Sequence, residues 1–570
     1  MPTFSAIFVI LLIFFLGLNN NANLFTVEKD DVNSTSNNQQ ETFNSQSNIQ
    51  TENDDYNLRG AVSNTSGGKQ VLEKHQTFLC GGSFEKRTDF IQEYTLPFPC
   101  SQPVGITVEQ QNNTNNNTNT NTNYNTTNPK KVWIAATWVG YLVGFDPVSK
   151  RFTDFIEIPN WKTKGDFGSM VWDMEFDKKG DLWFTDQVNN AIWRYFPTDK
   201  RFEMYKVPTN GSYPSSLAFD SQGRVWFSEI FGKKLGVINP AKTSNNTSTG
   251  IQEYQLNMSK EEGFETMGPL VITDTTSNNT NSNYYNETVW FTAVNFPESG
   301  HVIKFDIDTK KFEVLKLPVG AGTPVGIVED NGRLWINDHA TNLFFVFDPQ
   351  TGKAVKYSTS LPTSRNNTTT LPYYNMYRDG KLWFNEHEGN AMAYFDIANL
   401  TLVEYQIPTR GEAWGNTSNP LQFTLDNNGS AWFTEWTENK IGVLDSEKTK
   451  NLPLWISTNS SSVDLDREKD HDGKSIKVFV YPNRSNLVTK ENEPVEMTVA
   501  GTMSYTGKLW NLTGNFDKEE FYFPEGSKGP QVVTLKLTPD QNLVPGDYTL
   551  TLGARYGTVT SSKIIDLNVK

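Results

Sequence analysis

Seven tryptophans recur in one short motif, and this repeat constrains the fold more than any other feature of the chain. They lie 43 to 64 residues apart, at Trp133, Trp183, Trp226, Trp290, Trp335, Trp383 and Trp432. The motif is clear in GDLWFTD at 180–186 and in GRVWFSE at 223–229. A period of about 40 to 50 residues with several short strands is typical of a β-propeller.

Each repeat is predicted to hold four strands. The first resembles PVGIV at 324–328, the second is the tryptophan motif, and the third resembles KIGVLD at 440–445. The fourth resembles FEMYKVP at 202–208. A long open sandwich does not account for seven copies in register, so we expect an all-β chain that contains a seven-bladed propeller over 76–456.

The ends of the repeat region indicate how the ring closes. The segment FIQEYTLP at 90–97 has the pattern of a fourth strand but no strands before it, and the last repeat is clear only through Asp445. We therefore predict that this N-terminal strand completes the seventh blade, which removes both open sheet edges. The segment 452–456 is a rival for the same position.

The tryptophan period stops near residue 457, and a different pattern follows. Seven or eight short strands are predicted over 457–570. Their spacing suits an immunoglobulin-like β-sandwich, although the region lacks the cysteine pair and the strand-C tryptophan of antibody domains.

The N-terminus indicates export. Residues 6–18 form an apolar run that fits a signal peptide or an uncleaved membrane anchor, so membrane contact is expected only through this segment. Residues 19–75 are Asn/Ser-rich and aperiodic, which predicts a disordered tether. Nineteen Asn-x-Ser/Thr sites follow partly from composition, but their density suits a secreted or cell-surface glycoprotein.

Charge and cysteine content narrow the alternatives. The chain carries 50 basic and 65 acidic residues, a net charge of −15, which disfavours nucleic acid as a partner. Its two cysteines, Cys80 and Cys100, exclude a disulfide-dense scaffold and a four-cysteine zinc site. They flank the 90–97 strand of an exported chain, so we predict that they form a disulfide.

Familiar catalytic motifs are missing from the sequence. It has no GxSxG, HExxH or CxxC motif and no GxxxxGK[ST] phosphate-binding loop. Its five histidines offer few general bases near neutral pH.

One face of the predicted propeller concentrates polar residues. The second strands all end at the same face, and five of them end in an acid: Asp186, Glu229, Asp338, Glu386 and Glu435. Such a rim could bind a cationic ligand, or Mg²⁺ or Ca²⁺ as a cofactor. A residue type that recurs in most repeats also fits a scaffold role, and the sequence leaves both interpretations open.

Departures from the repeat are stronger functional candidates, because the scaffold does not require them. They are His339, His387, Glu388 and Trp436 at the ends of second strands, with Glu412 and Trp414 in a loop on the same face. We take His339, His387 and Glu386 as catalytic candidates, Asp338, Trp414 and Trp436 as ligand-binding candidates, and Glu386 and Glu435 as metal-binding candidates.

The repeated pattern G-x-L-W-F-T-[DE], I-G-x-F-D-P and F-x-E-Y-x-[IL]-P resembles the streptogramin lyases over about residues 90–445. The resemblance implies a seven-bladed propeller and a magnesium-assisted elimination that opens a cyclic depsipeptide lactone. It also implies catalytic histidines in Pro-His-(Gly/Ala)-Ile at the start of the last two repeats. Tyr373 and Leu421 stand there instead, Asn419 replaces an acid, and Glu435 stands near the family's metal-binding carboxylate.

These substitutions favour the fold of the family over its chemistry. Leu421 cannot transfer a proton, and Tyr373 with an ordinary pKa near 10 is a poor base. We therefore expect a binding propeller for a polar or cationic ligand, a peptide or a glycan, with the sandwich as a spacer or adhesion module. The alternative is a metal-assisted carbon–oxygen lyase or a lactonase-like enzyme that acts on a cyclic ester.

Overall fold

The structure is a computed structural model. It describes residues 81, 84–110, 129–161, 163–164, 167–243, 245–258, 266–274, 287–295, 298–363, 368–411, 416–483, 493–523 and 529–570. These residues belong to one compact unit, Val71–Lys570. The apolar run at 6–18, the predicted tether at 19–75, Cys80, Glu412 and Trp414 lie outside the described residues. None of the helices in the described ranges is long and apolar enough to span a membrane.

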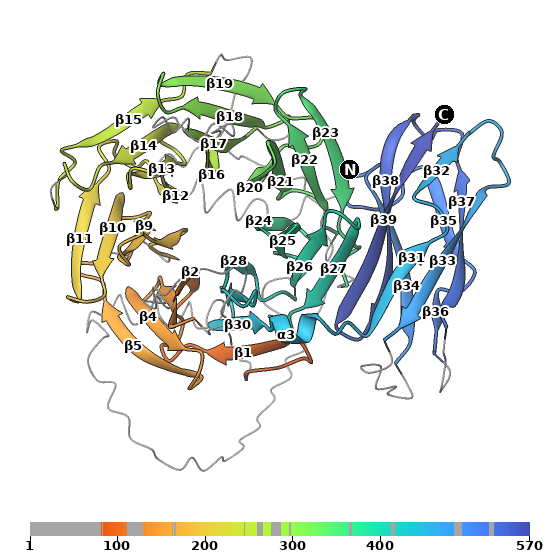
Figure 1. Ribbon diagram of the computed structural model, residues 1–570, viewed down its shortest axis with the longest axis horizontal. Helices are drawn as coiled ribbons and strands as arrows, with labels where there is room; N and C mark the ends of the chain where they lie inside the picture. The colour runs from red at the N-terminus through yellow and green to blue at the C-terminus, as the bar shows by residue number, and fades with distance from the viewer. Residues whose placement is uncertain are drawn as a thin grey trace, which may run out of the picture. The chain divides into compact units, whose positions relative to one another are not determined.

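The chain is nearly all-β, and each recurring tryptophan lies in a four-stranded antiparallel unit consistent with a β-propeller (Figure 1). We name each sheet by its tryptophan. The Trp133 sheet holds β2 (Pro103–Glu109), β3 (Lys131–Ala136), β4 (Tyr141–Asp146) and β5 (Arg151–Glu157). The Trp183 sheet holds β8 (Met174–Phe176), β9 (Leu182–Asp186), β10 (Ala191–Phe196) and β11 (Arg201–Lys206). Between them lies a small ribbon, β6 (Thr163–Lys164) with β7 (Phe167–Gly168).

The remaining sheets repeat this order. The Trp226 sheet holds β12 (Pro214–Phe219), β13 (Val225–Glu229), β14 (Lys234–Ile238) and β15 (Ile251–Gln255). The Trp290 sheet holds β16 (Thr266–Asp274), β17 (Glu287–Val294), β18 (His301–Asp306) and β19 (Lys311–Lys316). The Trp335 sheet holds β20 (Pro324–Asp330), β21 (Arg333–Asp338), β22 (Leu343–Asp348) and β23 (Lys353–Ser358). The Trp383 sheet begins with β24 (Pro372–Arg378), β25 (Lys381–Glu386), β26 (Ala391–Asp396) and β27 (Thr401–Gln406).

The Trp432 sheet joins strands from both ends of the repeat region. It holds β28 (Pro420–Leu425), β29 (Ala431–Glu435), β30 (Lys440–Leu444) and β1 (Ile91–Thr95). β1 pairs antiparallel with β30, with Ile91 opposite Leu444. The rival segment at 452–456 instead enters β31 (Leu454–Thr458), which follows the short helix α3 (Ser446–Thr449) and pairs with β33 (Lys474–Pro482).

In three of the sheets, the indole group of the recurring tryptophan makes the same hydrogen bond. The indole Nε1 of Trp226 donates to Asp220 Oδ2 at 2.8 Å, and Trp183 and Trp432 donate to Asp177 and Asp426 at 3.0 Å. The same aspartates accept backbone N–H groups of the turn between the first and second strands, as Asp220 does from Arg224 at 2.8 Å. The tryptophan therefore fills the core between sheets and braces its own turn.

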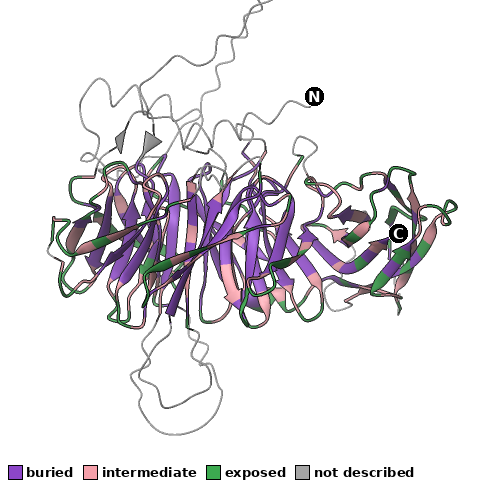
Figure 2. Cartoon of the chain, turned by 90° about the horizontal axis from the view of Figure 1, so that it is seen from above, coloured by how far each residue is buried: buried purple, intermediate pink, exposed green. Residues whose placement is uncertain are grey.

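Burial falls from the inner strands to the outer strand of a sheet (Figure 2). β3 is almost wholly buried, whereas β5 alternates between exposed and half-buried residues. The alternation is what one half-solvated face produces, because successive side chains point to opposite faces of a strand.

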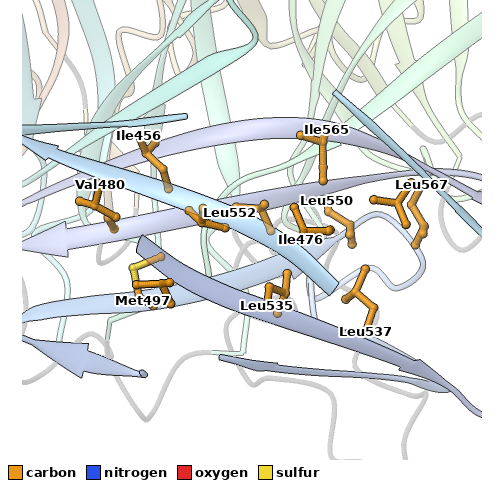
Figure 3. Packing of buried hydrophobic residues seen from close by; sticks show 14 of the residues in the cluster. Ile456, Ile476, Val480, Met497, Leu535, Leu537, Leu550, Leu552, Ile565 and Leu567 are labelled. Atoms are coloured by element: carbon orange, nitrogen blue, oxygen red, sulfur yellow. The ribbon is translucent and has the colours of Figure 1, made fainter. Parts of the chain in front are cut away.

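The C-terminal region forms two facing sheets around a separate apolar core. One sheet has the order β31, β33, β37 (Gln531–Pro539), β35 (Leu512–Phe516). The other contains β34 (Val495–Gly501), β36 (Glu520–Phe521), β38 (Gly546–Tyr556) and β39 (Val559–Val569), with β32 (Ser462–Leu465) parallel to β39. Ile456, Ile476, Leu535 and Leu552 are among the side chains between them (Figure 3).

The second of these sheets continues a propeller sheet. β27 pairs antiparallel with β39, with Leu402 opposite Ser562, so the Trp383 sheet becomes part of a nine-stranded sheet. Side chains reinforce this junction, since the Thr551 hydroxyl donates to the Ser358 carbonyl at 2.7 Å. Sequence analysis did not predict this continuous sheet.

Candidate functional site

The acids predicted to form a rim end the second strands as expected, but their side chains are buried. Asp186, Glu229, Asp338, Glu386 and Glu435 are each no more than 2% exposed. They therefore do not form an open ring of carboxylates facing solvent. Each one has to be understood from its own neighbours.

Asp338 braces the loop that precedes β20. Its Oδ1 accepts the backbone N–H of Thr323 at 2.8 Å and the Thr323 hydroxyl at 2.6 Å. Burial raises the pKa of Asp338 to about 6, against the lowering effect of these hydrogen bonds. Asp186 is held similarly, by the Ser169 hydroxyl at 2.6 Å and Trp193 Nε1 at 2.8 Å. These contacts are structural.

Glu435 belongs to a buried group that includes a lysine. Lys440 lies opposite Glu435 and Thr95 in the sheet register, and Glu93 is two residues before Thr95. Lys440 Nζ donates to Glu93 Oε2 at 3.1 Å and to Thr409 Oγ1 at 2.7 Å. The backbone N–H of Thr409 donates in turn to Glu93 Oε1 at 2.9 Å.

The Trp226 sheet repeats this arrangement. Lys234 lies opposite Glu229 and Gln255, and Glu253 is two residues before Gln255. Lys234 Nζ donates to Glu253 Oε2 at 2.6 Å, and the Thr209 N–H donates to Glu253 at 2.8 Å. Two sheets therefore use one device: a lysine at the start of the third strand, a glutamate on the fourth strand, and a threonine from the preceding loop.

The Trp383 sheet departs from this device at one position. Ala391 lies opposite Glu386 and Gln406, where the other two sheets place a lysine. Glu404 still accepts the Ser360 N–H at 2.8 Å and its hydroxyl at 2.5 Å. Burial, followed by the charge of the nearby Glu404, raises the pKa of Glu386 well above its usual value. Two neighbouring carboxyl groups in a buried site favour a proton on one of them, because two buried like charges repel each other.

Two histidines lie side by side at the ends of β21 and β25. The rings of His339 and His387 are parallel, with centroids 5.2 Å apart and an interplanar angle of 6°. His387 Nδ1 and His339 Nε2 are 3.2 Å apart. Their backbones are anchored, since the N–H of His339 donates to Thr323 O at 2.9 Å and that of His387 to Leu371 O at 3.0 Å. Sequence analysis placed both histidines on one face at the ends of second strands, and the structure adds that their rings are in direct contact.

Tyr373 completes the histidine cluster, which we define as His339, His387 and Tyr373. Its ring centroid is 4.7 Å from that of His339. Burial lowers the pKa of His387 to about 4 and that of His339 well below its usual value. Burial raises the pKa of Tyr373. Near neutral pH the cluster therefore contains two uncharged imidazoles and a protonated phenol, which donate and accept hydrogen bonds.

The other predicted site residues are dispersed. Leu421 and Trp436 are buried, and the backbone N–H of Trp436 donates to the backbone carbonyl of Asn419 at 3.3 Å. Glu388 accepts the Thr369 hydroxyl at 2.8 Å. Within the described ranges, no group of three or more His, Cys, Asp or Glu side chains is placed to hold a metal ion. The metal-binding roles of Glu386 and Glu435 stay predictions.

Cys100 is buried, and the described part of the chain contains no free cysteine. Because Cys80 lies outside the described residues, the Cys80–Cys100 disulfide also stays a prediction.

Comparison with family models and with curated proteins finds no match. Among solved structures, virginiamycin B lyase from Staphylococcus aureus is 22% identical, with a TM-score of 0.45, over 62% of this chain and 98% of that one. A streptogramin B lyase structure is 24% identical, with a TM-score of 0.46, over 62% and 97%. The extracellular domain of a one-component system from B. thetaiotaomicron is 14% identical, with a TM-score of 0.42, over 82% and 57%.

Proposed function

We propose that this protein is an exported or surface-anchored binding protein that recognises a polar ligand at the histidine cluster. It would present a seven-bladed propeller followed by an immunoglobulin-like sandwich. The observation that carries the proposal is the parallel contact of His339 and His387, 3.2 Å apart between ring nitrogens and backed by Tyr373. The repeat does not require these side chains: Gln187 and Ile230 occupy the equivalent places after Asp186 and Glu229.

The chemistry of the cluster favours hydrogen bonding over cation capture. Asp338 and Glu435, which could attract a cation, are 0% exposed, whereas His339 and His387 are 7% and 3% exposed and Tyr373 is half-buried. Asp338 is already committed to Thr323. Two neutral imidazoles and a phenol can instead pair with amide, hydroxyl or amine groups, as in a peptide, a glycan or a small amine.

The test compares His387→Ala with Gln187→Ala. Both changes remove a polar side chain directly after a second strand, but only the first reaches the histidine cluster. Thermal unfolding would be followed with tetra-alanine and N-acetylglucosamine as probes. We expect at least one probe to raise the Tm of the wild type and of Gln187→Ala, but not of His387→Ala. No stabilisation of the wild type by any probe, or equal stabilisation of all three proteins, would count against the proposal.

The alternative is a metal-assisted lyase or a lactonase-like enzyme. One contact favours it: Tyr373 stands where the streptogramin-lyase resemblance implies a histidine, and His339 packs against its ring. A base with the depressed pKa of His387 accepts a proton poorly, so we expect no lactone opening. Incubation with Mg²⁺ and a streptogramin B antibiotic, followed by mass spectrometry, decides this point. Turnover, or a stoichiometric divalent ion after mild purification, would favour the enzyme.

A further inference from the structure

The sheet β31-β33-β37-β35 has an outer face with an unusual composition. Strand alternation sends Ile456, Val478 and Val480 into the sandwich core, where Figure 3 shows Ile456 and Val480. The residues next to these inward-facing residues in each strand point outward, because successive side chains leave a strand on opposite faces. These outward residues include Trp455, which is 53% exposed, and Tyr481.

Four neighbouring side chains form an apolar group on part of this face. Trp455 lies opposite Tyr481 in the register, and their ring centroids are 4.5 Å apart at an angle of 36°. Phe479, two residues before Tyr481, lies opposite Val532, which is 40% exposed. We call Trp455, Phe479, Tyr481 and Val532 the aromatic strip. A single exposed apolar residue needs no explanation, but a contiguous group of them often marks a binding site.

The strip borders a hollow with polar edges. A hollow of about 320 Å³ is lined by Lys450, Leu452, Trp455, Pro482 and Asn483. Lys450 Nζ contacts Glu447 Oε1 at 2.6 Å, but both side chains are more than 60% exposed, so this ion pair is weak and exchangeable. The backbone is fixed here, since the Asn483 N–H donates to Pro453 O at 2.8 Å.

We propose that the aromatic strip and the adjoining hollow bind a hexopyranose unit of a glycan. A pyranose ring has a face of C–H groups that can lie on an indole, and an edge of hydroxyl groups that can bond to ammonium and amide groups. Trp455 and Tyr481 offer the ring surface, while Lys450 and Asn483 offer the polar groups. This site lies on the sandwich and is independent of the histidine cluster.

The size of the strip argues against a protein partner. A stable protein interface buries about 800 Å² on each side. One aromatic side chain buries at most about 250 Å², and every residue of the strip is already partly covered by its neighbours. The strip is therefore too small for such an interface but suits one or two sugar rings.

The test is affinity electrophoresis of the full chain in gels that contain yeast mannan, barley β-glucan or glycol chitin. We expect at least one polysaccharide to retard the wild type. Trp455→Ala and Tyr481→Ala should abolish most of that retardation, and Trp455→Phe should retain part of it. Trp510→Ala is the matched control, because Trp510 is 65% exposed and lies outside the strip.

Two further measurements make the outcome decisive. Thermal unfolding should differ little among these variants, since Trp455 and Trp510 are exposed and Tyr481 is half-buried on the outer face of the sheet, outside the core. His387→Ala should be retarded like the wild type, which separates this site from the proposed function of the propeller. Absence of retardation in all three gels, unchanged retardation of Trp455→Ala, or an equal loss in Trp510→Ala would overturn the proposal.

Discussion

Glu386 and Glu404 are two buried carboxyl groups in the Trp383 sheet, and the charge of Glu404 helps to raise the pKa of Glu386. Ala391 occupies the register position that Lys234 and Lys440 occupy beside the equivalent glutamates of two other sheets. With no ammonium group at that position, the pair must keep a proton to avoid two adjacent buried charges. This relationship leads to the first two predictions.

Replacing Glu386 by Gln should stabilise the protein increasingly as the pH rises. The pKa of Glu386 is raised in the folded state, so the folded chain binds more protons than the unfolded chain above about pH 4.5, and stability falls as the pH rises through this window. Glutamine donates to Glu404 without titrating. Urea unfolding should show little difference between wild type and variant at pH 4 and a gain of about 1 kcal/mol at pH 8. A gain that does not depend on pH would contradict the shared proton.

Replacing Lys440 by Ala should destabilise the protein strongly. The change leaves Glu93 and Glu435 without a lysine beside them, as in the Trp383 sheet. The residues around these two glutamates, however, are not adapted to its absence. Removing one partner of a buried ion pair typically costs about 3–5 kcal/mol. The loss should be smaller at pH 5 than at pH 7, because the Glu435 pKa is already raised by burial and the lost ammonium group lowered it. Lys234→Ala is the control; it should cost less, because Lys234 is 24% exposed.

Acid should destabilise the fold partly through His387. Its pKa falls to about 4 on folding, so the unfolded chain takes up more protons below pH 6.5. Stability from this group is present above pH 6.5 and is lost as the pH falls toward 4. The stability difference between wild type and His387→Asn should change by about 3 kcal/mol between pH 7 and pH 4. Urea unfolding across this range measures it, and parallel pH profiles would contradict a buried neutral imidazole.

Cys80 and Cys100 should form a disulfide. Cys100 is buried beside the strand that closes the Trp432 sheet. Closing a loop of this size would stabilise the fold by roughly 3 kcal/mol in the chain-entropy description. Thiol titration of the unreduced, unfolded protein should detect no free thiol; two thiols per chain would show that the bond is absent.

The repeat was readable from sequence because the same local chemistry recurs. In three of the sheets, the tryptophan, the aspartate six residues before it and the turn glycine cooperate within a single hairpin, as Asp220, Gly223 and Trp226 show. Local interactions of this kind leave a periodic trace. The lysine position was not readable from the repeat, because only Lys234 and Lys440 fill it, whereas Ala191 and Ala391 stand at the same register position in two other sheets.

Other features depend on packing between distant segments. The contact of His339 with His387 joins two sheets, and the burial of Asp338 and Glu386 depends on loops from neighbouring sheets. The pairing of β27 with β39 requires the edge of a propeller sheet to meet the last strand of the sandwich. The strand at 90–97 could be assigned because the last repeat lacked a fourth strand, but no such gap in the pattern marks β27 and β39 as partners.

The pairing of β1 with β30 has a consequence for biogenesis. β1 is among the first strands to be synthesised, yet its partner is complete only after Leu444 has been added. Until then β1 presents unsatisfied backbone groups while the intervening sheets are made, and an unpaired strand is prone to aggregation. Before it pairs, β1 is therefore expected to rely on charge for solubility. Glu93 and the nearby Glu85 supply this charge. The final closure, which buries Glu93 against Lys440, then converts a solubilising charge into an internal ion pair.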